Sequence, residues 1–441
     1  MASASSSATF SQAKSRTPGL VARFLALPGP ARIAAGLGLL WALLVVLFSS
    51  IGFFDPAEEA LLDWDQKCIA STAPGDGFAL VAISRVPSDR PWPWPRLDFA
   101  LVMRGLLPQM PQGVVFDPLL HDKDPRFSAF DQSFARLVDQ AGYAVFAAAA
   151  LQPPDGAPLP DGAVTLGDGG RKPHLPVFGS LLWPIATFAE GHPVGVANFS
   201  TEAGQPVRRL PLVFRVKDRL LPSLALAAAA SRLGADWTKS DFHPGGEIVL
   251  RDAAGKALRH IPVDDEGRLR LRYRNPGFQP LKIPYDDFLV YVDQLERGVA
   301  PAVDLERFSG RQVWIGLTDP EAADMKDTIL GRQPAVELQM QATAQIVRGE
   351  FLTSVPRPLV AFLFLVTGPL LACAAQRLPL ARAVLFVAGV AGAIFAAGVG
   401  ALLGADVCFP LAALVVLAGG ALLCSRAAIV WEMRPEPAKV E

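Results

Sequence analysis

The sequence is poor in cysteine, with only four in 441 residues. Three of them, Cys373, Cys408 and Cys424, lie in strongly apolar runs near the end of the chain, which leaves Cys68 alone in a polar context. One thiol cannot close an intramolecular bridge, so we predict no disulfide framework. Two readings of Cys68 stay open: a small, partly buried side chain, or an intermolecular disulfide.

The chain also lacks an excess of charge, since 41 Lys and Arg oppose 42 Asp and Glu. Nucleic-acid-binding proteins usually carry a basic surface, so we predict no nucleic-acid partner. No G-x-S-x-G elbow, phosphate-binding P-loop, H-E-x-x-H or C-x-x-C motif is present. The five histidines have no metal-ligand spacing. We therefore predict no enzyme, no catalytic residue, no metal and no cofactor.

Apolar residues are abundant, at 51% of the chain. Four runs, at 33–51, 359–375, 383–403 and 407–429, approach the ~20 residues that a membrane-spanning helix needs. A cleaved signal peptide is the alternative for the first run. Its long basic leader and the lack of an A-x-A site favour an uncleaved anchor. The lipid bilayer is thus an expected partner.

Basic residues orient these spans, because Lys and Arg concentrate in cytoplasmic segments. Lys14, Arg16 and Arg23 precede the first run, and Arg377 and Arg382 separate the second from the third. Both termini are therefore predicted to be cytoplasmic. The expected organisation is a disordered tail (1–30), a helix (31–54), an extracytoplasmic domain (55–357), three helices (358–376, 383–404, 407–430) and a cytoplasmic tail (431–441).

Within residues 55–357, short apolar runs alternate with amphipathic stretches. This pattern predicts an α/β domain with a mostly parallel sheet and helices on both faces. The expected strands are 78–84, 113–117, 143–149, 194–198 and 311–317; the expected helices are 55–70, 97–107, 130–141, 221–233 and 336–348. Residues 247–250, 258–261 and 269–273 are expected to form solvent-facing antiparallel strands, and 152–175 a loop.

Acidic residues follow two of the buried strands. Asp117 ends the strand 113–117, while Asp319 and Asp324 follow the strand 311–317. Open α/β sheets bind ligands at the carboxyl ends of their strands, so we predict a ligand-binding edge at these residues. Asp117 with Asp122, Asp124 and Asp131 would alternatively suit a hard cation, although aspartates at strand ends commonly cap turns.

The motif PWPWPR at 91–96 predicts a rigid, extended segment. Trp92 and Trp94 are candidates for an aromatic wall of a ligand site, or for a cover over the sheet edge. Arg96 is a ligand-binding candidate, or a structural partner of an acidic residue. In the apolar end of the chain, several glycines predict either tight helix packing or a homodimer.

Several of these stretches, in order, resemble the second type of CHASE domain, an extracytoplasmic sensory module of bacterial cyclases and histidine kinases. They are FALVAIS (78–84), PWPWPR, GVVFDPLL (113–120), VGVANFS (194–200), FSGRQVWIGLTDPEAADMKDT (308–328) and PAVELQMQA (334–342). The chain departs from the family at Ser84, where an Asp is usual, at Ala335, where a Gly is usual, and in QMQA, where a Gln replaces a His.

The resemblance implies a bacterial inner-membrane sensor with a periplasmic or extracellular domain that binds an unidentified ligand or protein. No cyclase, kinase or phosphatase follows the last apolar run, so we expect relay to a separate effector protein in trans. The alternative function is a scaffold or binding subunit of an envelope complex that does not signal.

Overall fold

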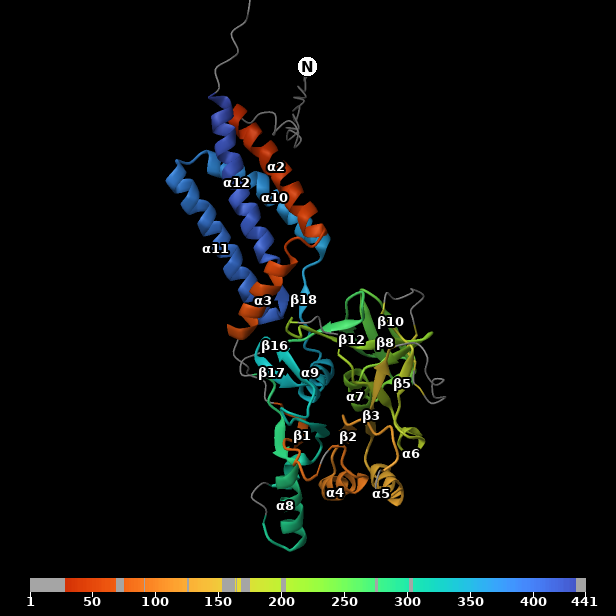
Figure 1. Cartoon of the computed structure of the whole chain (residues 1–441). Helices are drawn as coiled ribbons and strands as arrows, with labels where there is room; N and C mark the ends of the chain where they lie inside the picture. The colour runs from red at the N-terminus through yellow and green to blue at the C-terminus, as the bar shows by residue number, and fades with distance from the viewer. Residues whose placement is uncertain are drawn as a thin grey trace, which may run out of the picture. The chain divides into compact units, whose positions relative to one another are not determined.

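The computed structural model describes residues 28–68, 75–90, 92–124, 127–152, 163, 165–167, 175–199, 204–273, 277–300 and 304–433. The chain forms two compact units (Figure 1). The bundle unit comprises Met1–Leu62 and Ser354–Glu441, and the sheet unit comprises Asp63–Thr353. The boundary at residue 62 falls inside one helix, α3 (Asp55–Cys68).

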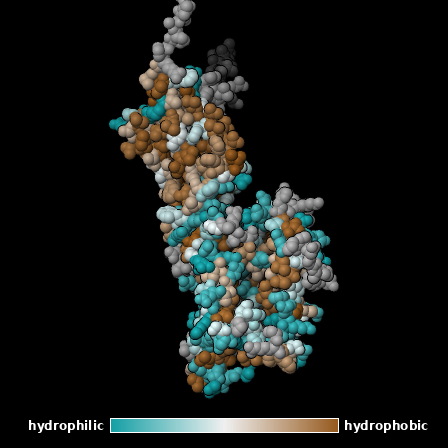
Figure 2. Space-filling model, viewed as in Figure 1, coloured by the Kyte–Doolittle hydropathy of each residue, from teal (hydrophilic) through white to brown (hydrophobic). Residues whose placement is uncertain are grey.

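Among its described residues, the bundle unit contains four helices that are long and apolar enough to span a membrane, as predicted. They are α2 (Gly29–Ser50), α10 (Arg357–Gln376), α11 (Leu380–Ala405) and α12 (Leu411–Glu432). Figure 2 shows hydrophobic residues over most of their visible surface. The fourth helix begins later than predicted, because Pro410 precedes it and Val407–Cys408 form a short strand, β19.

Small residues allow α2 and α10 to approach closely. A Cβ atom added at Gly38 of α2 would lie 2.9 Å from the Cβ atom of Ala372 in α10. Such contacts are a common basis of helix packing in membranes. At the end of α10, the Arg426 guanidinium donates to the carbonyl oxygens of Ala375 (2.8 Å) and Leu378 (3.1 Å). These bonds join α12 to the last turn of α10 and to the loop that follows it.

The sheet unit is built on a mostly parallel sheet, as predicted. Neighbouring strands run in the order β14, β1, β15, β2, β3, all parallel; β6 pairs with β3 in parallel and β5 pairs with it in antiparallel. The strands are β1 (Phe78–Ile83), β2 (Gly113–Phe116), β3 (Ala144–Leu151), β5 (Ser180–Leu182), β6 (Val194–Val196), β14 (Leu281–Pro284) and β15 (Gln312–Leu317).

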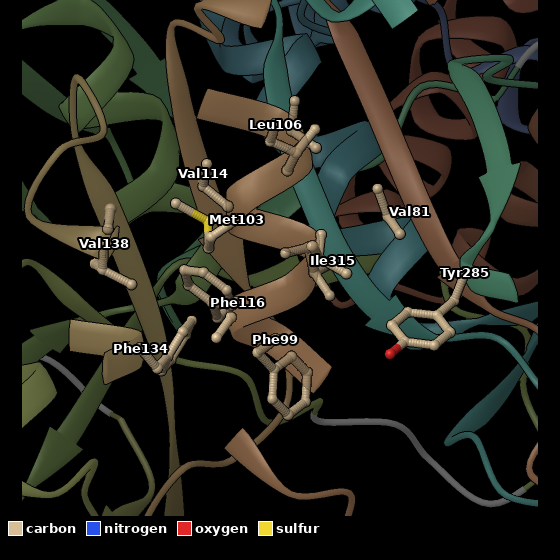
Figure 3. Close-up of a cluster of buried hydrophobic side chains, with 14 of the residues drawn as sticks. Val81, Phe99, Met103, Leu106, Val114, Phe116, Phe134, Val138, Tyr285 and Ile315 are labelled. Carbon is tan, nitrogen blue, oxygen red and sulfur yellow. The ribbon is translucent and has the colours of Figure 1, made fainter. Parts of the chain in front are cut away.

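Helices cover both faces of this sheet. On one face, α4 (Arg96–Leu106), α5 (Ala129–Val138) and α8 (Tyr285–Glu296) bury a cluster that includes Val81, Phe116 and Ile315 (Figure 3). On the other face, α7 (Leu224–Leu233) and α9 (Ala335–Arg348) pack on Leu80, Val115 and Trp314. Successive strand residues point to opposite faces, which explains why neighbours in sequence belong to different clusters.

Smaller sheets complete the unit. They are β4 (Val177–Phe178) with β8 (Val213–Val216) and β9 (Arg219–Pro222); β7 (Arg209–Pro211) with β13 (Arg268–Arg270); β10 (Asp236–His243) with β11 (Glu247–Arg251) and β12 (Ala257–Pro262); and β16 (Met325–Thr328) with β17 (Gly331–Pro334). The short helices are η1 (Leu107–Gln109), α6 (Ala186–Ala189) and η2 (Leu305–Phe308).

Two expectations from the sequence are corrected here, and two further elements were not expected. The strands expected to face solvent do not all do so, since Ile248, Val249 and Leu250 of β11 are buried. The helix expected to begin at residue 221 begins at 224, because Pro222 ends β9 and the Ser223 side chain caps α7. β14 and α8 have no counterpart in the prediction. Most of the expected loop 152–175 and of the expected tail 1–30 lies outside the described residues.

Gly316 provides a test of how closely α9 packs on the sheet. A Cβ atom at this position would overlap the Val336 side chain in the first turn of α9. We therefore expect Gly316→Ala to lower the free energy of unfolding by about 1–3 kcal/mol, the usual cost of overpacking. Thermal unfolding of the full chain would measure this effect. Val336→Ala in the same chain should restore part of the loss, and a double variant no more stable than Gly316→Ala alone would contradict this packing.

Candidate functional site

The carboxyl ends of β1, β15 and β2 bring polar residues from distant parts of the chain to one edge. Ile83 pairs with Leu317, and Ile315 pairs with Phe116. The ladder continues one step further, because the Thr318 amide donates to Ile83 (2.9 Å) and the Asp117 amide to Ile315 (3.0 Å). By strand alternation, Asp117 and Thr318 therefore lie on the face that α9 covers.

Asp117 has no counter-charge among the described residues at this edge. Its carboxyl group keeps some contact with solvent, and no hydrogen bond or ion pair reaches it from the described residues. Desolvation at the strand end, with a smaller contribution from the negative charge of Asp324, raises the pKa of Asp117 to about 7. The group is consequently about half ionised near neutral pH.

Asp324 lies beside Asp117 but has a partner. Its carboxylate is 2.8 Å from the Lys326 ammonium, which also lies 5.3 Å from the centre of the Phe199 ring. The Asp324 carbonyl accepts a hydrogen bond of 2.9 Å from the Ala335 amide, where α9 begins. The loop that carries Asp324 is thus joined directly to the first residue of α9.

Asp319 holds two loops together. Its carboxylate accepts hydrogen bonds from the amides of Val86 (2.6 Å) and Glu321 (2.9 Å). Val86 belongs to the loop after β1, and Glu321 belongs to the loop after β15. Asp319 therefore positions the backbone at this edge, and both of its carboxylate oxygens already have donors.

The tryptophans lie on the opposite face of the sheet. Trp94 is 1% exposed in the cluster that includes Val81, Phe116 and Ile315, its ring is 4.8 Å from that of Tyr285, and its Nε1 donates to the Arg90 carbonyl (3.1 Å). Trp92 packs against the same cluster, with its ring 5.9 Å from that of Trp94. These contacts place both rings over the sheet, in the position of a cover.

Arg96 forms a second buried group on that face. Its guanidinium lies 3.5 Å from Asp131 and donates to the Asp122 carbonyl (2.5 Å), while its amide donates to Asp124 (2.5 Å). Burial lowers the pKa of Arg96, and the three nearby aspartates oppose this effect. These contacts join the start of α4 to the loop after β2.

The structure therefore divides the predicted site residues. Asp117, Asp319 and Asp324 share one edge, whereas Trp92, Trp94 and Arg96 belong to the opposite face. The alternative cation site is not assembled, because Asp124 and Asp131 surround Arg96, and no three acidic, His or Cys side chains among the described residues could hold a metal ion. Thr318, Lys326 and Phe199 were not predicted; for Thr318 the signal was its place directly after a buried strand.

Replacing Asp117 by Asn should stabilise the protein at high pH. A carboxyl group whose pKa rises from 3.8 to about 7 on folding takes up protons, so the native state loses stability as pH increases through this range. One pKa unit corresponds to about 1.4 kcal/mol, and the solvent contact of the group reduces the total. We expect a gain of roughly 1–3 kcal/mol at about pH 8 that vanishes toward about pH 4.

Thermal unfolding at several pH values would measure this gain, with Asp287→Asn on the exposed surface of α8 as the control. A difference between the Asn variant and the wild type that does not change with pH would contradict the raised pKa.

Comparison with known proteins agrees with this architecture. No curated protein and no solved structure matches the chain. The CHASE2 domain family matches residues 39–374, which is more than half of the chain and includes the whole sheet unit. This family comprises extracytoplasmic sensor domains. Together with the four apolar helices, the match identifies a membrane protein with an extracytoplasmic domain, and the chain belongs to the CHASE2 family.

Proposed function

We propose that this protein binds an extracytoplasmic cue at the carboxyl edge of the sheet and transmits a conformational bias along α3 to its membrane helices. It acts by binding rather than by catalysis, from the bacterial inner membrane with both termini in the cytoplasm. The observation that carries the proposal is that α3 is anchored by side chains within each of the two units.

In the bundle unit, α3 is anchored to the start of α12. The Glu58 carboxylate accepts a hydrogen bond from the Ala413 amide (3.0 Å), and the amides of Leu411 and Ala412 also face it. A carboxylate at a helix N-terminus satisfies free amides and interacts favourably with the helix dipole. Burial raises the pKa of Glu58, and the amides oppose this rise.

In the sheet unit, the following turns of α3 are anchored to two loops. Arg208 binds both oxygens of Asp63, with its Nη2 at 2.8 Å from Oδ2 and its Nε at 3.1 Å from each oxygen. The Gln66 side chain accepts from the Tyr273 amide (2.8 Å). A bidentate arginine–carboxylate pair fixes orientation as well as distance. Any displacement of Arg208 is therefore expected to act on α3.

The same loop is bonded to the candidate site. The Val207 amide, next to Arg208, donates to the Asp327 carbonyl (2.7 Å) in β16, the strand that contains Lys326 and begins directly after Asp324. The Tyr273 hydroxyl donates to the Val207 carbonyl (2.5 Å). Short hydrogen bonds thus connect the loop of Asp324 to Arg208 and from there to α3.

Helix α9 contributes a second connection from the site. It begins at the Ala335 amide that donates to Asp324. Near its other end, the Gln345 side chain binds the Arg270 carbonyl (2.8 Å) and the Arg272 amide (3.0 Å), and Gln341 donates to the Arg272 carbonyl (2.9 Å). α9 therefore holds the strand that precedes Tyr273, the residue bound by Gln66 of α3.

Arg208→Gln tests the proposed transmission. This variant removes the charged pair with Asp63 in the sheet unit, so the transmission predicts a loosened α3 and weaker capping of α12 in the bundle unit. We expect the amides around Ala413 to exchange with deuterium several-fold faster in the full chain in nanodiscs. Arg251→Gln, which removes an ion pair of 3.7 Å with Asp241 in β10, is the matched control.

Unchanged exchange near Ala413, with faster exchange confined to residues of the sheet unit, would contradict a relay through α3.

The proposed recipient of the signal is a separate cytoplasmic or membrane effector protein, acted on in trans, and a second copy of the chain is a further proposed partner. Capture of the full chain from native membranes, followed by mass spectrometry, should recover an effector in amounts that differ between wild type and Arg208→Gln. Recovery of envelope-assembly proteins in equal amounts with both chains would favour the alternative, a scaffold subunit without signalling.

A further inference from the structure

We propose that the ligand of this site is a small organic cation, which binds at the carboxyl edge of the sheet through a primary ammonium group held by Asp117 and Thr318. The inference rests on the proposed function, because it names the chemical class of the cue.

Asp117 supplies the negative charge for such a ligand. Its neighbours at the edge are already occupied, since Asp319 accepts from two backbone amides and Asp324 pairs with Lys326. No described residue forms a hydrogen bond or an ion pair with the Asp117 carboxylate. The residue directly follows a strand and is partly exposed. A partly desolvated carboxylate is stabilised strongly by an opposite charge or by a hydrogen-bond donor.

Thr318 is an independent sign of a ligand. The residue is 7% exposed, and its hydroxyl oxygen has no hydrogen-bond partner among the described residues. Buried hydroxyl groups in proteins are nearly always hydrogen-bonded, so one without a partner calls for an explanation. The register of β2 and β15 places Asp117 opposite Gly316 and Thr318 two residues further along the same face, so a ligand at this edge would meet the Asp117 carboxylate and the Thr318 hydroxyl on one side of the sheet.

An ammonium group suits these acceptors better than a metal ion. The described residues offer no group of three metal-ligating side chains, and hard divalent cations need six or more oxygen ligands. An ammonium group carries three hydrogen-bond donors and a single charge, which one carboxylate balances. The same edge already accommodates one ammonium group, that of Lys326 between Asp324 and the Phe199 ring.

The binding test uses the purified full chain in nanodiscs, titrated calorimetrically with putrescine. Separate titrations with its neutral analogue 1,4-butanediol and with the ions Mg²⁺ and Ca²⁺ serve as comparisons. We expect putrescine to bind and butanediol not to bind. Affinity should fall about tenfold in Asp117→Asn and several-fold in Thr318→Val, but not in the surface control Asp287→Asn. Affinity should also increase from about pH 6 to about pH 8, because Asp117 ionises with a pKa of about 7 while the amine stays protonated.

Thr318→Val separates a ligand contact from a structural role. The valine has nearly the same shape and removes a hydroxyl without a protein partner, so the melting temperature of the free protein should not fall. No binding of putrescine, equal binding of butanediol, binding of divalent ions alone, or equal affinity in Asp117→Asn would overturn the proposal. The exchange experiment with Arg208→Gln needs no ligand, so the proposed relay can stand even where this ligand class fails.

Discussion

The placement of β15 between β1 and β2 is the constraint on which the rest of the sheet unit depends. β15 lies more than 190 residues after β2 in the sequence, yet it supplies the central strand to which both neighbours pair in parallel. This pairing brings Asp117 and Thr318 to the same edge. It also positions Gly316, whose missing side chain lets α9 lie close to the sheet. The positions of the candidate site and of α9 are therefore set by the same pairing of β15 with its neighbours.

The anchors of α3 limit how large the proposed conformational signal can be. A cue changes a conformational equilibrium only by the difference between its affinities for the two states. Hydrogen bonds to charged groups contribute about 1.5–3 kcal/mol each, so making or breaking the Asp63–Arg208 pair is sufficient for a shift of tenfold or more. The capping bond between Glu58 and α12 is of the same kind. Breaking or forming either anchor does not require the hydrophobic core of its unit to repack.

The elements predicted from the sequence are those that a local pattern of apolar residues reveals. Elements without such a pattern were not predicted. Strand β1 and helix α9 were predicted because apolar periodicity reports burial directly. The edge with Asp117 and Asp324 followed from the rule for carboxyl ends of parallel strands. Strand β14 was not predicted, because Leu281–Pro284 is short and three of its four residues are partly or fully exposed. The lone Thr318 hydroxyl was not predictable, because the absence of a partner depends on every neighbour in space.

Asp117 and Arg96 show why residue type alone does not identify a site. Both are charged residues in motifs that the sequence singles out, and both are withdrawn from water. Arg96 lies beside three aspartates, and its guanidinium donates to the carbonyl of one of them, Asp122, so its charge is compensated within the protein. The charge that acts on Asp117 is a like charge, that of Asp324. A carboxylate without a counter-charge lowers the stability of the folded protein at neutral pH. Binding of the proposed cation would supply the missing charge, and this explains why a functional site would keep such a residue.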